Sequence, residues 1–217
     1  MSLTLYIGNK AYSSWSLRPW LLMRVLDIPF AEVVTPLYVE GSRDRMLREA
    51  PTGKVPVLRD DEFAVWDSLA IVEYLAEKFP DLGVWPKAAP ARAQARSLCA
   101  EMHAGFQGLR QVCPTNFRRA RRASPLPLEE AARADLARIE AIFAETPARN
   151  GGPFLFGAFS AADAFFAPVV SRLDTYALEL APAARGYCDA ILALPAFAQW
   201  REGAKAETWV IDRWESV

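Results

Sequence analysis

The chain has 217 residues, 52% of them hydrophobic, and its basic and acidic side chains nearly cancel at a net charge of −1. This length is enough for one large packed domain or two modest ones, and the charge balance argues against a general nucleic-acid binder. No apolar stretch reaches membrane-spanning length and the N-terminus lacks a secretory-signal pattern, so we expect a cytoplasmic protein with neither membrane nor nucleic acid as its partner.

The first part of the chain alternates between strand-like and helical patterns. Apolar residues recur at helical spacing in two segments, 16–26 and 68–78, and a short polar helix is expected at 43–49. Short strand-like runs lie between these helices, at 3–7, 30–36, 55–58 and 63–66. The resulting order, βαβαββα, predicts a mixed sheet with helices packed on it.

From about residue 79 the pattern changes. The proline-rich stretch FPDLGVWPKAAP (79–90) is typical of a linker, and the chain beyond it is alanine-rich and helical. Two apolar stripes at helical spacing consist of Leu98, Met102, Phe106 and Leu109, and of Leu128, Ala132, Leu136, Ile139 and Phe143. We therefore predict an α/β domain at 1–80, a linker at 81–90 and an all-helical domain at 91–217.

The cysteines and the one histidine limit the chemistry. Cys99, Cys113 and Cys188 are odd in number and form no CxxC pair, which argues against structural zinc and against a disulfide framework. We expect them to be buried apolar residues. With His103 as the single histidine, neither a multi-histidine metal site nor a His-based triad is expected, and we predict no metal.

The stretch AYSSWSLRPW (11–20) places hydroxyl groups between the first strand and the first helix. Proline fits the first turn of a helix, so Pro19 favours a helix that begins near Ser16 with Ser16 as its cap. Ser13 and Ser14 would then lie just ahead of the positive end of the helix, where an anion is favoured and a bound thiol has a lowered pKa. Serine-rich joints are also ordinary caps, so both interpretations stay open.

Two further motifs lie downstream. GKVPVL (53–58) places Pro56 at the start of a predicted strand, and an X-Pro bond is the one peptide bond where the cis form is cheap. A cis Val55–Pro56 bond would turn the backbone N–H and C=O of Val55 outward. WDSLAIVEYL (66–75) places Ser68 in the first turn of a helix, directly after Asp67. This is a second anion-ready helix start, or a simple N-cap.

A hydroxyl loop, VPVL and an acid-Ser-LAIVEYL helix at these distances together resemble the glutathione transferase family. FSAADAFFAP (159–168) is similar to the capping box of that family's second domain, with Ser160 as the cap and Asp163 three residues on. The resemblance covers nearly the whole chain. It implies a thioredoxin-like N-terminal domain followed by an all-α domain.

Among the classes of this family, SSWSLRPWLL (13–22) is most similar to the serine-type theta and zeta groups. The zeta motif reads S-S-C-x-W-R. Trp15 stands where that motif has cysteine, and Leu17 stands where it has tryptophan. The bulky indole puts the isomerase activity of the zeta group in doubt.

The resemblance implies a role for each matching residue. A serine hydroxyl, of Ser13 or of Ser14, would donate to the glutathione thiolate. Val55, before the expected cis-Pro56, matches the residue that pairs with the cysteinyl part of glutathione. Asp67 and Ser68 match the pair that holds the γ-glutamyl end of glutathione. Lys54 could bind a carboxylate of the tripeptide or lie free in solvent.

The second substrate would lie between the two domains. We expect its pocket to draw on aromatic, methionine and arginine side chains, although such residues at helical spacing are also typical of plain core: Trp15, Met102, Phe106, Arg110, Phe117, Trp209 and Trp214. The run RRARR (118–122) could attract an acidic substrate, but a solvated charge run is the more common case.

We thus expect a homodimeric detoxifying enzyme that conjugates glutathione, as co-substrate, to a small electrophile. One alternative is glutathione-dependent cis–trans isomerisation of a maleyl-type diacid such as maleylacetoacetate. Arg110 favours this alternative, whereas Trp15 argues against it. The other is a noncatalytic binding or scaffold protein of the same fold.

Overall fold

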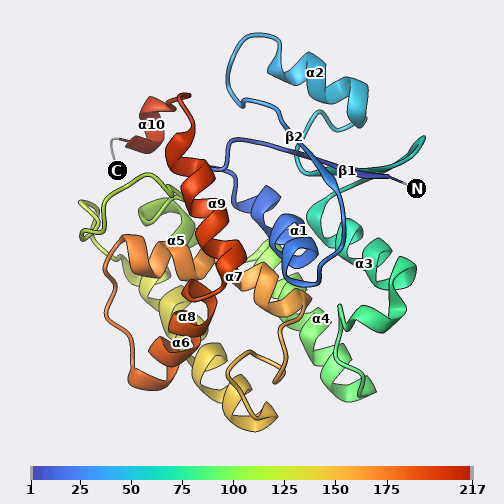
Figure 1. The fold of residues 1–217 in the computed structure, drawn as a ribbon. Coiled ribbons are helices and arrows are strands. Elements are labelled where there is room, and N and C mark those ends of the chain that lie inside the picture. Colours follow the sequence, from blue (N-terminus) through green and yellow to red (C-terminus); the bar gives the residue numbers. More distant parts are fainter. Residues whose placement is uncertain (1, 216–217) are drawn as a thin grey trace.

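Four short strands form one mixed sheet in the computed structural model, which describes residues 2–215 (Figure 1). The strands are β1 (Leu3–Ile7), β2 (Ala31–Val34), β3 (Val57–Asp60) and β4 (Phe63–Trp66), in the spatial order β2-β1-β3-β4. β2 runs parallel to β1, whereas β3 and β4 are antiparallel to their neighbours. The predicted order βαβαββα and the mixed sheet are confirmed.

Alternate residues of the strands face two different layers of helices. Leu5 and Ile7 point into the main core, which they share with the helices α1 (Ser14–Val25) and α3 (Ser68–Lys78). Tyr6 and Val57 face a small second cluster around Met46 of α2 (Ser42–Glu49). In Figure 1, α2 accordingly lies on the opposite side of the strands from α1 and α3. The period-two alternation of the strands explains the three layers.

The second half of the chain is helical and is built around one almost fully buried helix. That helix is α7 (Ala161–Thr175), which packs against α1 from the sheet half. The others are α4 (Ala89–Ala104), α5 (Gln107–Val112), α6 (Glu130–Asn150), α8 (Pro182–Leu192), α9 (Pro195–Ala206) and the short α10 (Asp212–Glu215). The fold is therefore a thioredoxin-like α/β unit with an all-α unit packed on it; the division at 1–80, 81–90 and 91–217 stays a prediction.

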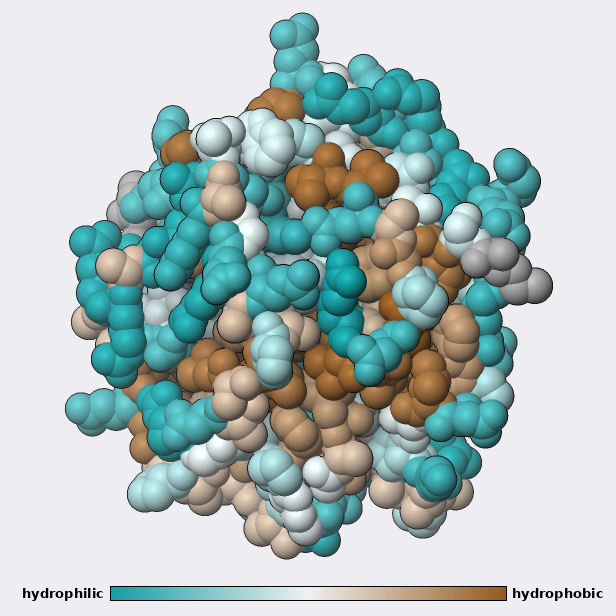
Figure 2. Space-filling view, in the orientation of Figure 1, coloured by the Kyte–Doolittle hydropathy of each residue, from teal (hydrophilic) through white to brown (hydrophobic). Residues whose placement is uncertain are grey.

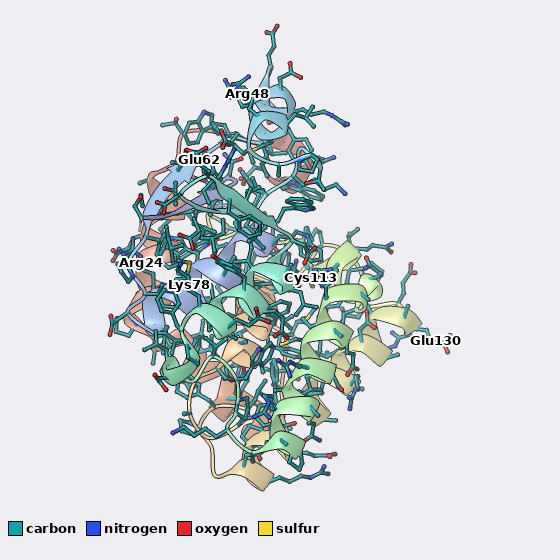
Figure 3. All side chains as sticks on the ribbon, turned by 90° about the vertical axis from the view of Figure 1, so that its right-hand side faces the viewer. Arg24, Arg48, Glu62, Lys78, Cys113 and Glu130 are labelled. Atoms are coloured by element: carbon teal, nitrogen blue, oxygen red, sulfur yellow. The ribbon has the colours of Figure 1, made fainter. Side chains whose placement is uncertain are left out.

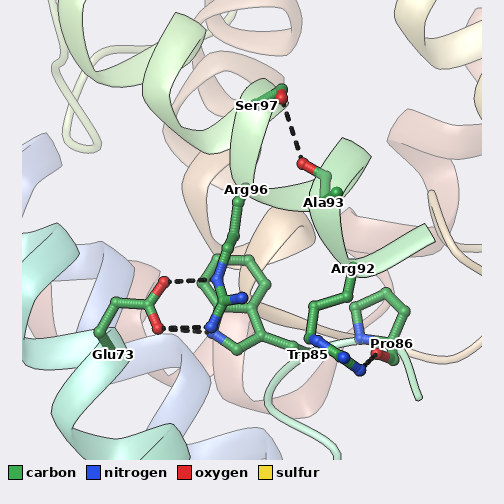
Figure 4. A network of polar contacts seen from close by, with 7 residues as sticks. All are labelled: Glu73, Trp85, Pro86, Arg92, Ala93, Arg96 and Ser97. Atoms are coloured by element: carbon green, nitrogen blue, oxygen red, sulfur yellow. Dashed lines mark hydrogen bonds and ion pairs between the residues drawn. The ribbon is translucent and has the colours of Figure 1, made fainter. Parts of the chain in front are cut away.

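A polar network joins the two halves beside the linker, which contains the 3₁₀ turn η1 (Pro80–Leu82). Glu73 of α3 accepts two hydrogen bonds from Arg96 of α4, at 2.8 and 3.0 Å, and one from the indole of Trp85 at 3.2 Å (Figure 4). The Arg92 guanidinium donates to the Pro86 carbonyl in the same place. A bidentate arginine–carboxylate pair fixes orientation as well as distance, so it helps to hold α3 and α4 in one relative position.

The first helix begins earlier than the proline suggests. α1 starts at Ser14 with Ser13 as its N-cap, so the expected start near Ser16 and the expected cap by Ser16 are wrong. Pro19 is consequently the sixth helical residue and lies inside the helix. It lacks the N–H that would bond to the carbonyl of Trp15. Burial of nearly the whole of α1 offsets that lost bond.

The helical stripes also differ from their expected course. α4 ends at Ala104, and Phe106 adopts a positive φ of 61° before α5 begins. Phe106 is therefore the N-cap of α5 and Leu109 lies within α5, so neither continues the stripe of α4, although both remain in the core. α6 begins at Glu130, so Leu128 lies outside it. The second strand is shorter than 30–36, because only residues 31–34 pair with β1.

The three cysteines are buried and unpaired. Burial raises the pKa of the Cys99 and Cys113 thiols, that of Cys113 to about 11. Cys113 lies inside the molecule, whereas Arg48 of α2 and Glu130 of α6 lie at its periphery (Figure 3). Across residues 2–215, no helix is both long enough and apolar enough to cross a membrane.

The capping box at the start of α7 places a carboxylate in the centre of the helical half. Asp163 accepts hydrogen bonds from the Ser160 N–H at 2.9 Å, from the Leu155 N–H at 3.0 Å and from the Tyr187 hydroxyl at 3.2 Å. Burial nevertheless raises the pKa of the Asp163 carboxyl to about 6. The stability of the core thus depends on these partners being present together.

We therefore expect Asp163→Ala to lower the free energy of unfolding by about 3 kcal/mol or more, because it leaves buried donors unpaired. Urea unfolding measures this loss. The matched control is Asp189→Ala in α8, where the carboxylate is exposed and the change should stay within about 0.5 kcal/mol. Equal midpoints for the two variants would contradict the role of the box.

Candidate functional site

A cavity of about 690 Å³ opens between the sheet half and the helical half. Its lining comes from the start of α1, from the loops around β2, α2 and residue 54, from α5 and α7, and from the C-terminal segment. The lining residues are Tyr12, Ser13, Ser14, Trp15, Leu37, Tyr38, Ser42, Arg43, Met46, Gly53, Lys54, Val55, Arg110, Pro114, Thr115, Arg172 and Trp214. The face shown in Figure 2 is hydrophilic over α2, at the top.

The two serines before and at the start of α1 have different roles. The Ser13 oxygen accepts the N–H of Ser16 at 3.3 Å, and its hydroxyl lies 2.8 Å from that of Ser16. Ser16 in turn accepts the N–H of Gly8 at 3.0 Å. Ser13 is therefore the helix cap, and its hydroxyl group is occupied within the protein.

The Ser14 hydroxyl is placed differently. Ser14 is the first residue of α1 and lines the cavity, with 6% of the residue exposed. Within residues 2–215, its hydroxyl makes no hydrogen bond to the protein. A free donor at the positive end of a helix can bind an anion in the cavity.

Tyr12 also lines the cavity, but its hydroxyl is engaged. It donates to the carboxylate of Glu215 and accepts the N–H of Ile211 at 3.3 Å. Burial and the bond to Glu215 raise the pKa of the phenol. Tyr12 therefore stays protonated and turned toward the C-terminal segment, which leaves Ser14 as the free hydroxyl at the start of α1.

The loop before β3 forms another part of the cavity wall. The Val55–Pro56 bond is cis, as expected, and Val55 precedes the paired residues of the strand. Val55 and Lys54 line the cavity, whereas Pro56 is buried behind them. The Lys54 side chain is exposed.

Asp67 and Ser68 do not line the cavity. Asp67 is the N-cap of α3, and its side chain accepts the N–H of Leu69 at 2.8 Å. Ser68 is buried, and its hydroxyl accepts a hydrogen bond from Arg18 of α1 at 3.3 Å. Arg18 thus ties the start of α3 to the first helix.

Trp15 lies between charged groups from both halves of the molecule. The Arg18 guanidinium stacks 4.2 Å from the centre of its ring, and that of Arg110 lies at 5.5 Å. His103 of α4 meets the indole edge-on at 4.9 Å and approaches the Asp67 carboxylate at 3.5 Å. Burial lowers the pKa of His103, so the imidazole is neutral near pH 7 and this contact is a polar one.

Arg18, Arg110 and Arg172 lie close enough together to affect one another's pKa, and two of them, Arg110 and Arg172, line the cavity. Burial and the neighbouring Arg110 lower the pKa of Arg18 and of Arg172 to about 9, which still leaves both protonated at neutral pH. Arg110 and Arg172 line the cavity, and neither forms an ion pair with a carboxylate in the described part of the chain. The Nε of Arg172 and the hydroxyl of Thr115 are buried without hydrogen-bond partners there.

Several expected pocket residues lie elsewhere. Met102, Phe106 and Phe117 are 1%, 7% and 2% exposed, belong to the core and do not line this cavity. Trp214 lines it, but Trp209 lines a separate groove beside β2. The apolar periodicity that suggested the first three is that of ordinary core packing. Trp15 and Arg110, in contrast, line the cavity.

The basic run 118–122 contacts the C-terminal segment through Arg118 and α7 through Arg121. Arg118 donates to the Trp209 carbonyl at 3.0 Å, and Arg121 pairs with Asp174 at 3.3 Å. None of these arginines lines the cavity. Sequence reasoning missed Tyr12, Tyr38, Arg43 and Arg172; an arginine in the apolar run of α7 was the one local signal that could have pointed to Arg172.

Two family models match the chain. Residues 12–78 match the glutathione S-transferase N-terminal domain, and residues 89–203 match the glutathione S-transferase C-terminal domain. Among curated proteins, dichloromethane dehalogenase of Methylorubrum extorquens is 42% identical over 65 residues, which are 29% of this chain and 23% of that protein. A probable maleylacetoacetate isomerase of Caenorhabditis elegans is 32% identical over 108 residues, half of each chain. The chain thus spans at most half the length of these relatives.

Solved structures share the fold over nearly the whole chain. A Burkholderia glutathione transferase homolog with bound glutathione is 22% identical, has a TM-score of 0.72 and is matched over 95% of this chain and 100% of that one. A bacterial zeta-class maleyl pyruvate isomerase gives a TM-score of 0.71 at 23% identity, with the same coverage.

The two serines should separate in their effect on stability. Ser13→Ala removes the cap and is expected to lower the free energy of unfolding by about 1 kcal/mol. Ser14→Ala removes no hydrogen bond and should change it by less than about 0.5 kcal/mol. Urea unfolding without any ligand measures both, and a larger loss for Ser14→Ala would contradict the assignment of the cap.

Proposed function

We propose that this chain, which belongs to the glutathione S-transferase family, conjugates the thiolate of glutathione to a small electrophile. The single observation that carries the proposal is the free hydroxyl of Ser14 at the start of α1, inside the cavity. It is supported by a solved relative of the same fold that holds glutathione.

Glutathione would lie along the sheet side of the cavity. The backbone of Val55 would pair with its cysteinyl part, and Lys54 would approach a carboxylate of the tripeptide. The γ-glutamyl carboxylate would rest near the start of α3, where Asp67 and Ser68 lie. Asp67 and Ser68 do not line the cavity, so the γ-glutamyl end would extend beyond the lined volume.

The chemistry needs a stabilised anion and no metal. The thiol loses its proton to solvent, the Ser14 hydroxyl donates to the resulting thiolate, and the positive end of α1 adds a favourable field. The thiolate then attacks the electrophilic carbon and forms the C–S bond, either with departure of a leaving group or by addition to a double bond. Serine keeps its own proton throughout.

We expect glutathione bound to the wild-type protein to have a thiol pKa below the value of about 8.5 for a free thiol. Ser14→Ala should raise that pKa by about one unit, since a hydrogen bond to a charged group contributes about 1.5 kcal/mol. Conjugation at pH 7 would then fall about tenfold, and the pH profile would shift to higher pH. Ultraviolet difference spectra of the bound thiolate across pH measure the pKa directly.

Ser13→Ala is the matched comparison at the adjacent position. If it raises the thiol pKa and Ser14→Ala does not, the assignment of the donor is reversed. If glutathione binds to the wild-type protein without a thiolate band, the noncatalytic scaffold becomes the better account.

Isomerisation of a maleyl-type diacid is the second candidate function. The observation that favours it is the pair Arg110 and Arg172, which lines the cavity without a carboxylate partner in residues 2–215. Guanidinium groups bind carboxylates in a bidentate manner. The thiolate would add to the double bond, the resulting single bond would rotate, and the same thiolate would leave, so that glutathione is regenerated.

The two functions respond differently to loss of a cavity arginine. Arg172→Gln and Arg110→Gln are each expected to raise KM for a maleyl-type diacid about tenfold, the effect of one lost charge-assisted hydrogen bond. With a neutral alkyl halide the KM should stay within about twofold. Arg149→Gln, an exposed arginine of α6, is the control. An equal effect on both substrates would argue against a carboxylate site.

We further propose a cytoplasmic homodimer. The edge strand β4 exposes Phe63 and Trp66, at 59% and 40%, and an exposed sheet edge with aromatic side chains favours association.

A further inference from the structure

The segment that leads into Ser14 forms a turn at residues 9–13, in which the N–H groups of Tyr12 and Ser13 both bond to the Asn9 carbonyl. Residues 8–13 connect β1 to α1, and the bond from the Ser13 N–H is 2.8 Å long. The preceding residues, Lys10 and Ala11, point their backbone groups toward other parts of the chain. Their positions are therefore also set by contacts that are distant in sequence.

Glu207 provides the central contact. One oxygen of its carboxylate accepts the Lys10 N–H at 2.7 Å, and the other accepts the Ala11 N–H at 3.0 Å. Two consecutive backbone donors thus share one bidentate acceptor from a segment nearly 200 residues away. Such bonds to a charged acceptor are short and directional.

The carbonyl groups of the same two residues are also held. The Trp200 indole N–H donates to the Lys10 carbonyl at 3.0 Å, and the Phe117 N–H donates to that of Ala11 at 2.9 Å. Trp200 belongs to α9 and Glu207 directly follows it. Trp200 of α9 and Glu207, the residue after α9, therefore bind both C=O and N–H groups of the loop.

The surroundings of Glu207 act on the pKa of its carboxyl in opposite directions, with burial the larger effect. Burial raises the pKa of its carboxyl, while the bonds from Ala11 and Lys10 and the cations Lys10 and Arg118 oppose that shift. The Lys10 side chain itself is held at 2.6 Å by Glu32 and lies over the ring of Trp20. The carboxylate of Glu207 thus has the backbone N–H groups as its direct partners.

We propose that Glu207 is a positioning residue for the loop of residues 8–13, which leads into Ser14. By fixing Lys10 and Ala11, it places the start of α1, and with it the Ser14 hydroxyl, where a thiolate can be stabilised in the cavity. The inference rests on the proposed function. It assigns to the C-terminal segment a part in the reaction that does not require contact with either substrate.

The test compares Glu207→Ala and Glu207→Gln with Glu202→Ala, which removes an exposed glutamate from α9. In Glu207→Ala we expect faster backbone amide exchange at Lys10 and Ala11, and a higher pKa of the bound glutathione thiol. A small displacement of a reacting group is costly, so kcat/KM at pH 7 should fall about tenfold, mainly through kcat. Glu207→Gln keeps one acceptor oxygen and should fall between Glu207→Ala and the wild type.

A merely structural role gives a different result. In that case Glu207→Ala lowers the midpoint of urea unfolding, while the folded variant keeps the wild-type thiol pKa and kcat, and the inference is overturned. Unchanged amide exchange at Lys10 and Ala11 overturns it too. If the wild-type protein shows no thiolate band, both the proposed function and this inference are overturned. If the wild-type band is present and Glu207→Ala leaves it unchanged, only the inference is overturned.

Discussion

The cap of α1 is the interaction on which the site depends. Ser13 closes the first turn of the helix through Ser16, and Ser16 in turn holds the N–H of Gly8 at the end of β1. Strand, loop and helix are thereby joined by two buried hydroxyl groups. Because this chain of bonds uses the hydroxyl of Ser13, the next residue, Ser14, is left with a free hydroxyl at the positive end of the helix.

The same helix brings the positive charge of Arg18 into the interior. Arg18 is nearly fully buried, where it stacks between Trp15 and Phe165 of α7 and reaches Ser68 at the start of α3. Such a group is costly to bury, and carbonyls and aromatic faces offset only part of the lost hydration. Arg110 and Arg172, on the cavity wall, have no carboxylate partner within residues 2–215. An anion bound in the cavity would balance their charge.

The loop after the first strand and the C-terminal segment meet at this site. The loop after β1 is held by Trp200 and Glu207, and Tyr12 is held by Ile211 and Glu215. These contacts join residues about 190 to 200 positions apart. The helical half is therefore more than a cover for the cavity, because its last segment hydrogen-bonds to the loop that leads into Ser14.

The sequence by itself determined the order βαβαββα, the cis-proline loop and the Ser160–Asp163 capping box, because each depends on residues a few positions apart. Spacing, proline and capping chemistry act over that range. The same local reasoning proposed the two serines and Val55 as site residues and predicted a helix start at Asp67–Ser68. Only the tertiary structure decided that Ser13 and not Ser16 caps α1 and that Met102, Phe106 and Phe117 are core. It also decided that Arg172 lines the cavity and that Glu207 bonds to the loop before α1. Periodicity shows that a helical face is apolar but not what it packs against, and the bonds of Glu207 join segments that no local pattern connects.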